Sequence, residues 1–219
     1  MSYYIAPPCL KEIEELYRDE DLLIVNKPDG LFTVPGRGPE NRDSVLVRLK
    51  DKYPTMTLVH RLDLDTSGIL ILALSKEATS HINRQFQLRA VNKYYTAVLF
   101  GVVKEDEFTI SLPIGPDWND RPRNKIDYEA GKEAVTKVTV LDRDVAGNQT
   151  RVVFKPVTGR SHQLRLHSKS IGHPILGCDL YAHEEAFKQA NRLMLHATGI
   201  GFVHPTKGKW VSWETDVPF

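Results

Sequence analysis

The feature that most constrains the fold is a succession of short apolar runs separated by turn residues. LLIVNK (22–27), GILILALS (68–75) and KYYTAVLFG (93–101) are rich in β-branched, aromatic and aliphatic residues, and each has the length of a strand. Pro28 and Gly30 punctuate the chain directly after the first run and indicate a sharp turn. Strands that follow one another this closely are expected to pair locally.

Extending this pattern along the chain predicts many strands and few helices. Strands are expected at 12–17, 22–27, 58–64, 68–75, 93–101, 107–113, 133–143, 150–157, 193–204 and 209–215. Helices are expected at 44–53 after an Asp43 N-cap, at 76–89 after a Ser75 cap, at 161–171 and at 183–192. The segment 113–132 is expected to be a loop, and a Gly147-Asn148 turn should join two of the strands. These elements predict an α+β fold with a mixed, largely antiparallel central sheet and flanking helices and loops.

Composition excludes several classes of protein. The 219 residues are 41% hydrophobic and 26% charged, which is ordinary for a globular chain. No apolar run reaches the ~18–20 residues of a membrane span, and MSYYIAPPCL lacks the pattern of a signal peptide. Cys9 and Cys178 are too few for a disulfide framework and fit reduced thiols in a cytoplasmic protein. No ligand spacing typical of a metal site is present, so we expect none.

Charge is nearly balanced overall but unevenly distributed. The net charge is +1, and a strongly basic balance, the usual sign of a nucleic-acid-binding domain, is absent. From Leu10 to Asp29 there are seven acidic and three basic residues, whereas His81 to Lys104 and Arg151 to Cys178 contain basic residues and no acid. The two acid-free segments either form one positive face for RNA phosphates or scatter their charges over the surface.

The stretch HRLDLDTSG (60–68) places two carboxylates two residues apart. If the strand is extended, Asp63 and Asp65 lie on one face together with Arg61. The pair is compatible with a glycosidase-like acid and nucleophile, or with one nucleophile and a bystander. For Asp65 we favour a structural role in the turn at Gly68, and periodicity alone does not assign Asp63.

A second polar cluster occupies TGRSHQLRLH (158–167). On the expected helix Arg165 follows Ser161 by one turn and lacks a local acidic partner. It is either a surface arginine or the partner of a phosphate or of a distant carboxylate, for which Asp63 is a candidate. His162 and His167 are five residues apart, which does not suit shared metal ligation on a helix, so packing or RNA contact is the interpretation.

Lys93-Tyr94-Tyr95 forms a third cluster. Neighbouring tyrosines on a strand face opposite ways, so one can pack in the core while the other lines a cleft. A ring in basic surroundings suits stacking on a nucleobase, although a structural tyrosine is the commoner case.

Taken in order, these segments resemble the motifs of the RluA-type pseudouridine synthases. HRLDLDTSG resembles the HRLD-x-x-TSG signature of that family, and LLIVNKPDGL is similar to its N-terminal motif. KYYTAVLFG and TGRSHQLRLH resemble its tyrosine and arginine motifs, and GHPILGCDLY and LMLHA its later motifs. The resemblance extends from about Tyr17 to the end of the sequence, and it implies the fold of that family's catalytic domain with a catalytic cleft.

The resemblance also implies roles for individual residues. Asp63 matches the catalytic aspartate, Tyr95 the ring that stacks on the base, Arg165 the arginine that pairs with Asp63, and Leu195 an apolar floor. Contacts with RNA are expected from His60, Arg61, Lys93, Arg160 and His162. The family converts the N-glycosidic bond of uridine to a C-glycosidic bond without cofactor or metal. Attack at C1′, addition at C6 and proton removal at C2′ all stay open as routes.

The substrate is also implied by resemblance. PDWNDRPRNKIDYEAGK (116–132) and VPGR (34–37) are similar to segments of a family member that acts on both a hairpin of 23S ribosomal RNA and tRNA anticodon stem-loops. Residues 1–16 are too few for the S4-like RNA-binding domain of some relatives. We therefore expect a single catalytic domain over residues 1–219, with 1–16 as an N-terminal extension, acting in the cytoplasm as a monomer.

Overall fold

The computed structural model describes residues 4–219, which form two compact units. The first unit contains residues 4–92 and 197–216, and the second contains 93–196 and 217–219. Residues 1–3 of the expected N-terminal extension lie outside the described residues. Residues 4–13 precede the first strand, and the Asn41 side chain binds them through the Tyr4 carbonyl and the Ala6 amide.

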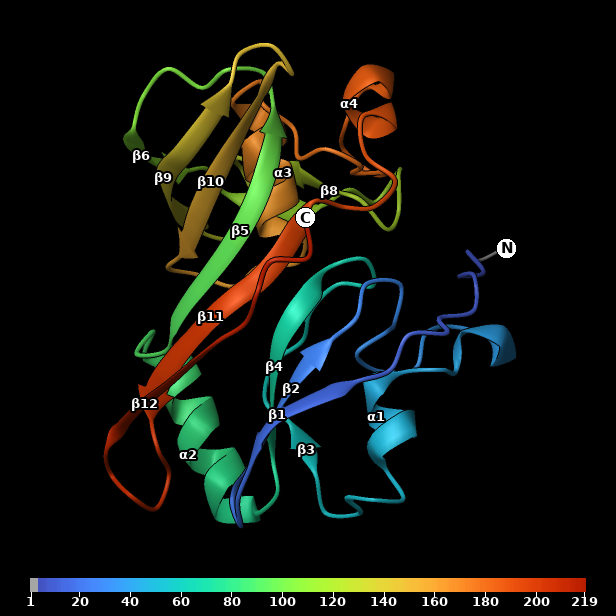
Figure 1. The fold of residues 1–219 in the computed structure, drawn as a ribbon, viewed down its shortest axis with the longest axis vertical. Coiled ribbons are helices and arrows are strands. Elements are labelled where there is room, and N and C mark those ends of the chain that lie inside the picture. The colour runs from blue at the N-terminus through green and yellow to red at the C-terminus, as the bar shows by residue number, and fades with distance from the viewer. Residues whose placement is uncertain (1–3) are drawn as a thin grey trace. The chain divides into compact units, whose positions relative to one another are not determined.

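Strands make up most of the regular structure in both units (Figure 1). The strands are β1 Glu14–Arg18, β2 Leu22–Lys27, β3 Thr57–Leu58, β4 Ser67–Ala73, β5 Asn92–Phe100, β6 Glu107–Ser111, β7 Ile114–Pro116, β8 Asn124–Ile126, β9 Val135–Asp144, β10 Gln149–Pro156, β11 Leu195–Val203 and β12 Trp210–Glu214. The helices are η1 Pro39–Asn41, α1 Val45–Leu49, α2 Lys76–Gln87, α3 Gln163–Ser170 and α4 Glu184–Lys188.

The first unit is built on β1, β2, β4 and β11, which lie side by side in this order. β3 pairs with β4 and β12 with β11, and the pairs β1–β2, β2–β4, β3–β4 and β11–β12 are antiparallel. Alternate residues of β2 and β4, such as Ile24 and Ile71, enter one hydrophobic cluster. Helix α2 contributes Ile82 to this cluster, and Ser75 caps its first turn by accepting from the Ala78 amide.

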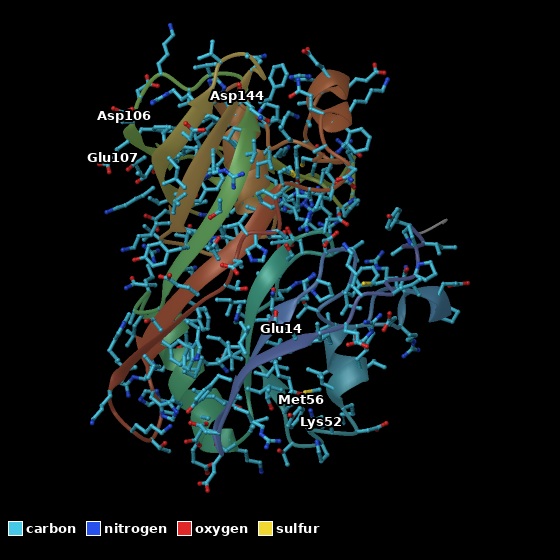
Figure 2. The ribbon with its side chains drawn as sticks, in the orientation of Figure 1. Glu14, Lys52, Met56, Asp106, Glu107 and Asp144 are labelled. Atoms are coloured by element: carbon cyan, nitrogen blue, oxygen red, sulfur yellow. The ribbon has the colours of Figure 1, made fainter. Side chains whose placement is uncertain are left out.

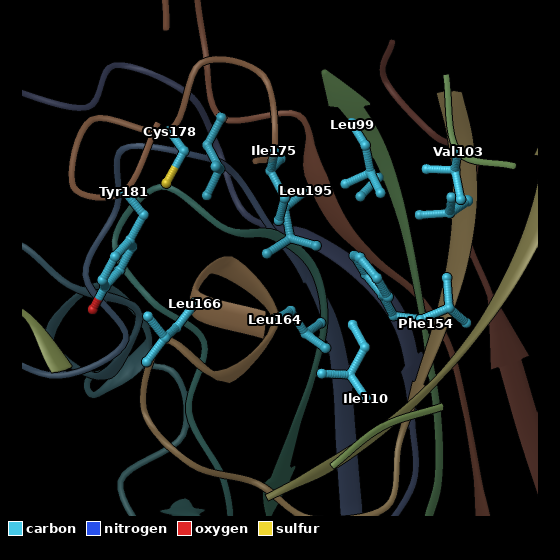
Figure 3. Close-up of a cluster of buried hydrophobic side chains, with 14 of the residues drawn as sticks. Leu99, Val103, Ile110, Phe154, Leu164, Leu166, Ile175, Cys178, Tyr181 and Leu195 are labelled. Atoms are coloured by element: carbon cyan, nitrogen blue, oxygen red, sulfur yellow. The ribbon is translucent and has the colours of Figure 1, made fainter. Parts of the chain in front are cut away.

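The second unit is built on the antiparallel strands β5, β10, β9 and β6 in that order. Helix α3 packs against this sheet, so that Leu164 and Leu166 join strand residues such as Leu99 and Phe154 in one buried cluster (Figure 3). β7 and β8 form a separate two-stranded sheet. The predicted α+β fold with a largely antiparallel sheet is confirmed.

Three sequence predictions about elements need correction. The run 58–64 was expected to be a strand, but only Thr57–Leu58 is one, because side-chain hydrogen bonds hold the following loop in place of a strand partner. The expected helix 44–53 is Val45–Leu49, and its cap is Ser44, since Asp43 pairs with Arg48 instead. The expected loop 113–132 contains the β7–β8 pair.

Two turn predictions also need correction. The link between β9 and β10 is a four-residue turn, 145–148, because the Asp144 carboxylate accepts from the Gly147 amide and Asn148 takes a left-handed conformation. Helix α3 starts after His162, not at Ser161, since His162 has φ 57°.

Candidate active site

The loop that carries Asp63 is irregular but firmly held on the side preceding it. No regular element covers residues 59–66. The buried Thr33 hydroxyl donates to the Leu62 carbonyl at 2.8 Å and accepts from the Leu62 amide at 3.2 Å. One side chain therefore satisfies both main-chain groups of the residue before Asp63, and it does so in place of a strand partner.

The residue after Asp63 is held from a different segment. The Leu64 carbonyl accepts from the Gly30 amide at 3.1 Å and from the Lys27 ammonium at 3.0 Å. The Asp63 carbonyl in turn accepts from the Thr66 amide. The main chain is thus fixed on both sides of Asp63. Asp63 itself is half-buried. A catalytic group needs this kind of preorganised support.

The lysine that donates to the Leu64 carbonyl, Lys27, lies in the interior of the first unit. Its side chain is fully buried at the end of β2, and burial lowers the pKa of its ammonium to about 7. The negative charges of Asp65, Asp63 and Asp29 oppose this shift, Asp65 most strongly. The sequence places Lys27 at the end of the expected strand LLIVNK, and we predicted no separate role for its side chain. The available signal was a lysine two positions after the apolar run LLIV, on the same strand.

The residues before Asp63 differ in exposure. The Nε2 atom of His60 accepts from the Ile71 amide at 2.9 Å, and its ring packs against Phe86 with centroids 5.2 Å apart. The ring proton of His60 therefore lies on Nδ1 when the ring is neutral. Arg61 is exposed. A contact of either residue with RNA stays a prediction.

In the second unit, Tyr95 and Leu195 belong to the same apolar neighbourhood. Leu195 is buried in the cluster shown in Figure 3, and Tyr95 packs against that cluster from β5. Tyr94 points the other way, with the Lys155 ammonium 5.3 Å from its ring centroid. The predicted alternation of the two tyrosines is confirmed.

Arg165 is buried, which excludes the interpretation as a surface arginine. Its Nε donates to the Cys178 sulfur at 3.2 Å, and its Nη2 pairs with the Asp179 carboxylate. Its guanidinium carbon lies 5.6 Å from the ring centroid of Tyr181. Three residues of GHPILGCDLY therefore orient this arginine within the unit, and sequence analysis gave none of them a role. Pairing of Arg165 with Asp63 stays a prediction.

The other residues expected to bind RNA in this unit gather at the start of α3. The Lys93 ammonium donates to the Thr158 carbonyl at 3.2 Å, and burial lowers its pKa to about 8. Arg160 donates to the Glu133 carbonyl. The Nδ1 atom of His162 lies 2.8 Å from the Tyr181 hydroxyl oxygen, within hydrogen-bond distance. The same hydroxyl also accepts from the Asn124 amide at 2.8 Å.

Some acidic side chains of the second unit lie on or next to the strands β6 and β9. Figure 2 shows Asp106 and Glu107 at the start of β6 and Asp144 at the end of β9, all of them exposed. The acid-free segment 151–178 instead supplies β10 and α3. Acidic and basic residues are nevertheless neighbours within this sheet, because Asp142 of β9 lies opposite Arg151 of β10. A single positive face that includes residues 81–104 stays a prediction.

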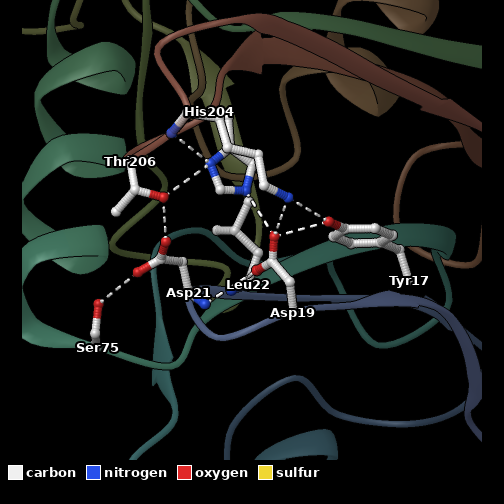
Figure 4. Close-up of polar contacts among 8 residues, drawn as sticks. Tyr17, Asp19, Asp21, Leu22, Ser75, His204 and Thr206 are labelled. Carbon is white, nitrogen blue, oxygen red and sulfur yellow. Dashed lines mark hydrogen bonds and ion pairs between the residues drawn. The ribbon is translucent and has the colours of Figure 1, made fainter.

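One group of side chains has the composition of a metal site. Ligand atoms of Asp19, Asp21 and His204 lie within 4.8 Å of one another (Figure 4). However, the Lys207 ammonium is 2.8 Å from the Asp19 carboxylate, and the Thr206 hydroxyl donates to Asp21. The cluster already contains its own cation, so we assign it a structural role.

Within residues 4–219, no helix is long and apolar enough to cross a membrane.

Comparison with known proteins identifies the family. The family model for RNA pseudouridylate synthases matches residues 21–170. The chain is 47% identical over 204 residues to the dual-specificity RNA pseudouridine synthase RluA of Yersinia pestis, covering 93% of this chain and 98% of the relative. The chain belongs to the RNA pseudouridylate synthase family. The RluA of Escherichia coli K12 is 44% identical over 213 residues, with 97% of each protein covered.

Solved structures of pseudouridylate synthases share the fold. Human RNA pseudouridylate synthase domain containing 1 superposes with a TM-score of 0.82 at 31% identity, covering 97% of this chain and 86% of that one. Human RNA pseudouridylate synthase domain containing 4 has a TM-score of 0.75 at 23% identity, which supports the fold alone.

Membership in the pseudouridylate synthase family confirms the expected class of enzyme. The chain is an RNA pseudouridine synthase, an isomerase that acts on RNA. A carboxylate-pair glycosidase and a non-catalytic RNA-binding module are not favoured by these relatives. The motif resemblance that rested on HRLDLDTSG is confirmed at the level of the family.

Proposed function

We propose that this pseudouridine synthase isomerises uridines in structured RNA with Asp63 as its catalytic residue. The observation that carries the proposal is the fixed main chain on both sides of Asp63, through Thr33 at Leu62 and through Lys27 and Gly30 at Leu64.

Both the relatives and the loop 116–132 support a dual specificity, for a 23S ribosomal RNA hairpin and tRNA anticodon stem-loops. The cytoplasm is the compartment of these RNAs, and a monomer is the proposed state.

Each remaining group has a proposed part in the chemistry. The target uridine leaves its stack to reach the carboxylate. Tyr95 stacks on the base and Leu195 forms an apolar floor, so that the detached uracil is retained until it rejoins the ribose through C5. Arg165 is proposed to pair with Asp63, held in orientation by Cys178 and Asp179. The scheme uses no cofactor and no metal, and attack at C1′, addition at C6 and proton removal at C2′ all stay compatible with a carboxylate.

The variant Asp63→Asn tests the proposal. An amide is neither a comparable nucleophile nor a base, so isomerisation should fall by at least about 10³-fold, as when other enzymes lose the nucleophile. RNA affinity, measured by filter binding, should stay within about threefold because phosphate contacts dominate it. Pseudouridine formation is measured by carbodiimide modification and primer extension on a 23S hairpin and on a tRNA stem-loop.

Asp65→Asn is the matched control, since it removes a carboxylate two residues away in the same loop. We expect it to retain isomerisation. Wild-type turnover by Asp63→Asn would refute the catalytic assignment. Equal loss in both variants together with release of free uracil would instead support a carboxylate-pair hydrolase.

A further inference from the structure

Trp118 is the most exposed tryptophan of the described residues. It lies in the turn that joins β7 to β8, and 77% of its surface is accessible to solvent. The guanidinium carbon of Arg121 lies over its ring, 5.1 Å from the ring centroid. Burying a ring of this size stabilises a protein, and tryptophan is highly buried on average. The chain therefore leaves unused a large apolar surface that has a cation beside it.

The turn 117–123 that carries Trp118 is held by its own hydrogen bonds. The Asp117 amide donates to the Arg123 carbonyl at 3.0 Å, and the Arg123 amide donates to the Asp120 carbonyl at 2.8 Å. The Asp120 carboxylate also pairs with the Arg123 guanidinium at 2.6 Å, and the Asp117 carboxylate accepts from the Asn119 amide. Both carboxylates of the turn are thus used within it. An ordered support of this kind lowers the entropy cost of binding a ligand on the ring.

The base of the β7–β8 hairpin is joined to the segment that carries Arg165. The Asn124 side chain donates to the Ser161 carbonyl at 2.9 Å, and the Asn124 amide donates to the Tyr181 hydroxyl at 2.8 Å. The Tyr181 ring in turn lies beside the Arg165 guanidinium, and β8 lies next to α3 (Figure 1). An RNA bound by the proposed site residues of this unit therefore has the hairpin beside it.

We propose that Trp118 stacks on an unpaired base of the RNA substrate, a base other than the target uridine. An aromatic ring accepts the π face of any base, and the Arg121 charge favours a polyanion. Such a contact selects a single-stranded loop over a duplex, in which the bases already stack on one another. An exposed tryptophan also suits a protein partner, but the link from the hairpin to Arg165 favours RNA. The inference rests on the proposed function, because it concerns the RNA on which that function acts.

The test measures the Kd of Trp118→Ala and Trp118→Phe for an RNA hairpin with a single-stranded loop and for a blunt duplex of the same stem. Trp118→Ala should weaken binding of the hairpin by about 10-fold, within the range that the loss of one base–aromatic stack costs, and Trp118→Phe by less than about threefold. The affinity for the duplex should be the same in both variants as in wild type. Saturating hairpin RNA should quench tryptophan fluorescence more in wild type than in Trp118→Phe.

Tyr128→Ala is the matched control. Tyr128 is 78% exposed, but it lies at the opposite end of the same hairpin, because Ile126 pairs with Ile114 two positions before it. This variant should bind the RNA hairpin as wild type does. Wild-type affinity of Trp118→Ala for the hairpin, or an equal loss of affinity for hairpin and duplex, overturns the stacking role.

Sedimentation of the RNA-free protein separates an RNA contact from a protein contact. A wild-type dimer that Trp118→Ala dissociates would overturn the inference in favour of a second copy of the chain. If Trp118→Ala binds the hairpin normally while Asp63→Asn is inactive, the stacking role fails and the proposed function survives. Turnover by Asp63→Asn would refute the proposed function itself, whatever the affinity of the Trp118 variants.

Discussion

Asp63 and Asp65 differ in how the molecule uses them, although they lie only two residues apart. Asp63 stands between two residues whose main-chain groups are bound by Thr33, Lys27 and Gly30. Asp65 is the strongest negative neighbour of the Lys27 ammonium. With the proposed catalytic role at Asp63, Asp65 is left as a counter-charge to Lys27. Asp65→Asn should therefore lower the pKa of Lys27 further while it leaves the Asp63 carboxylate in place.

The lowered pKa of Lys27 should make the free energy of unfolding depend on pH. Its pKa is about 7 in the folded chain against an ordinary 10.5, so between these values the unfolded chain binds one proton more than the native chain. The free energy of unfolding of wild type, relative to Lys27→Met, should then increase by about 1.4 kcal/mol per pH unit in this window. Urea unfolding at about pH 7.5 and about pH 9, inside this window, measures the change. A difference that does not depend on pH would mean that Lys27 titrates as in the unfolded chain.

Among the elements, β4 and the loop before it show where a local sequence pattern predicts a strand correctly and where it does not. The apolar run GILILALS predicts it, and the strand Ser67–Ala73 is buried throughout. The preceding alternation in LVHRLDL is equally strand-like, yet it forms a loop beyond Leu58. The difference lies in partners: β4 pairs with β2, whereas the loop is bound by the side chains of Thr33 and Lys27. The residues of LVHRLDL do not by themselves indicate that these side chains will bind them.

Gly68 marks the boundary between this loop and β4. It has φ 115°, and a Cβ added there would lie 2.4 Å from the Ala197 carbonyl oxygen of β11. Because that neighbour is main chain, Gly68→Ala should lower the free energy of unfolding by about 3 kcal/mol or more. Gly208→Ala is the control, since φ is 63° but no atom lies within 4 Å of the added Cβ, and it should cost about 1 kcal/mol. Denaturant unfolding compares the two, and equal costs would show that the contact with Ala197 is unimportant.

At the scale of the whole molecule, the first unit is assembled from two separate stretches of the described chain. Residues 197–216 return to the unit formed by 4–92, and β11 takes its place beside β4. A polar cluster ties the returning segment in place, because Asp19 accepts from both His204 and Lys207 (Figure 4). Desolvation opposes ionisation of Asp19, but bonds from Lys207, Tyr17, the Asp21 amide and His204 outweigh it and hold its pKa well below the ordinary 3.8.

Asp19→Asn should therefore destabilise the first unit in a pH-dependent way. A lowered pKa in the folded chain means stability that is present above pH 3.8 and lost as the pH falls toward the folded value. We expect a loss of about 1–3 kcal/mol at neutral pH, which shrinks in acid. Asp106→Asn, which removes an exposed partner of Arg143, should cost at most about 1 kcal/mol. Thermal unfolding across this pH range tests both, and equal effects would contradict the structural role of the cluster.

The sequence by itself determined the fold class, most elements and the family. Strands such as β2 and β4 and the capped helix α2 follow from periodicity and capping residues that act over a few positions. Asp63, Tyr95 and Arg165 could be chosen as site residues because short motifs surround each of them. Only the tertiary structure decided that Lys27 and Thr33 hold the Asp63 loop, and that Cys178 and Asp179 orient Arg165. These contacts join segments far apart in the chain, and burial, which sets the charge of Lys27, exists only once those segments have packed.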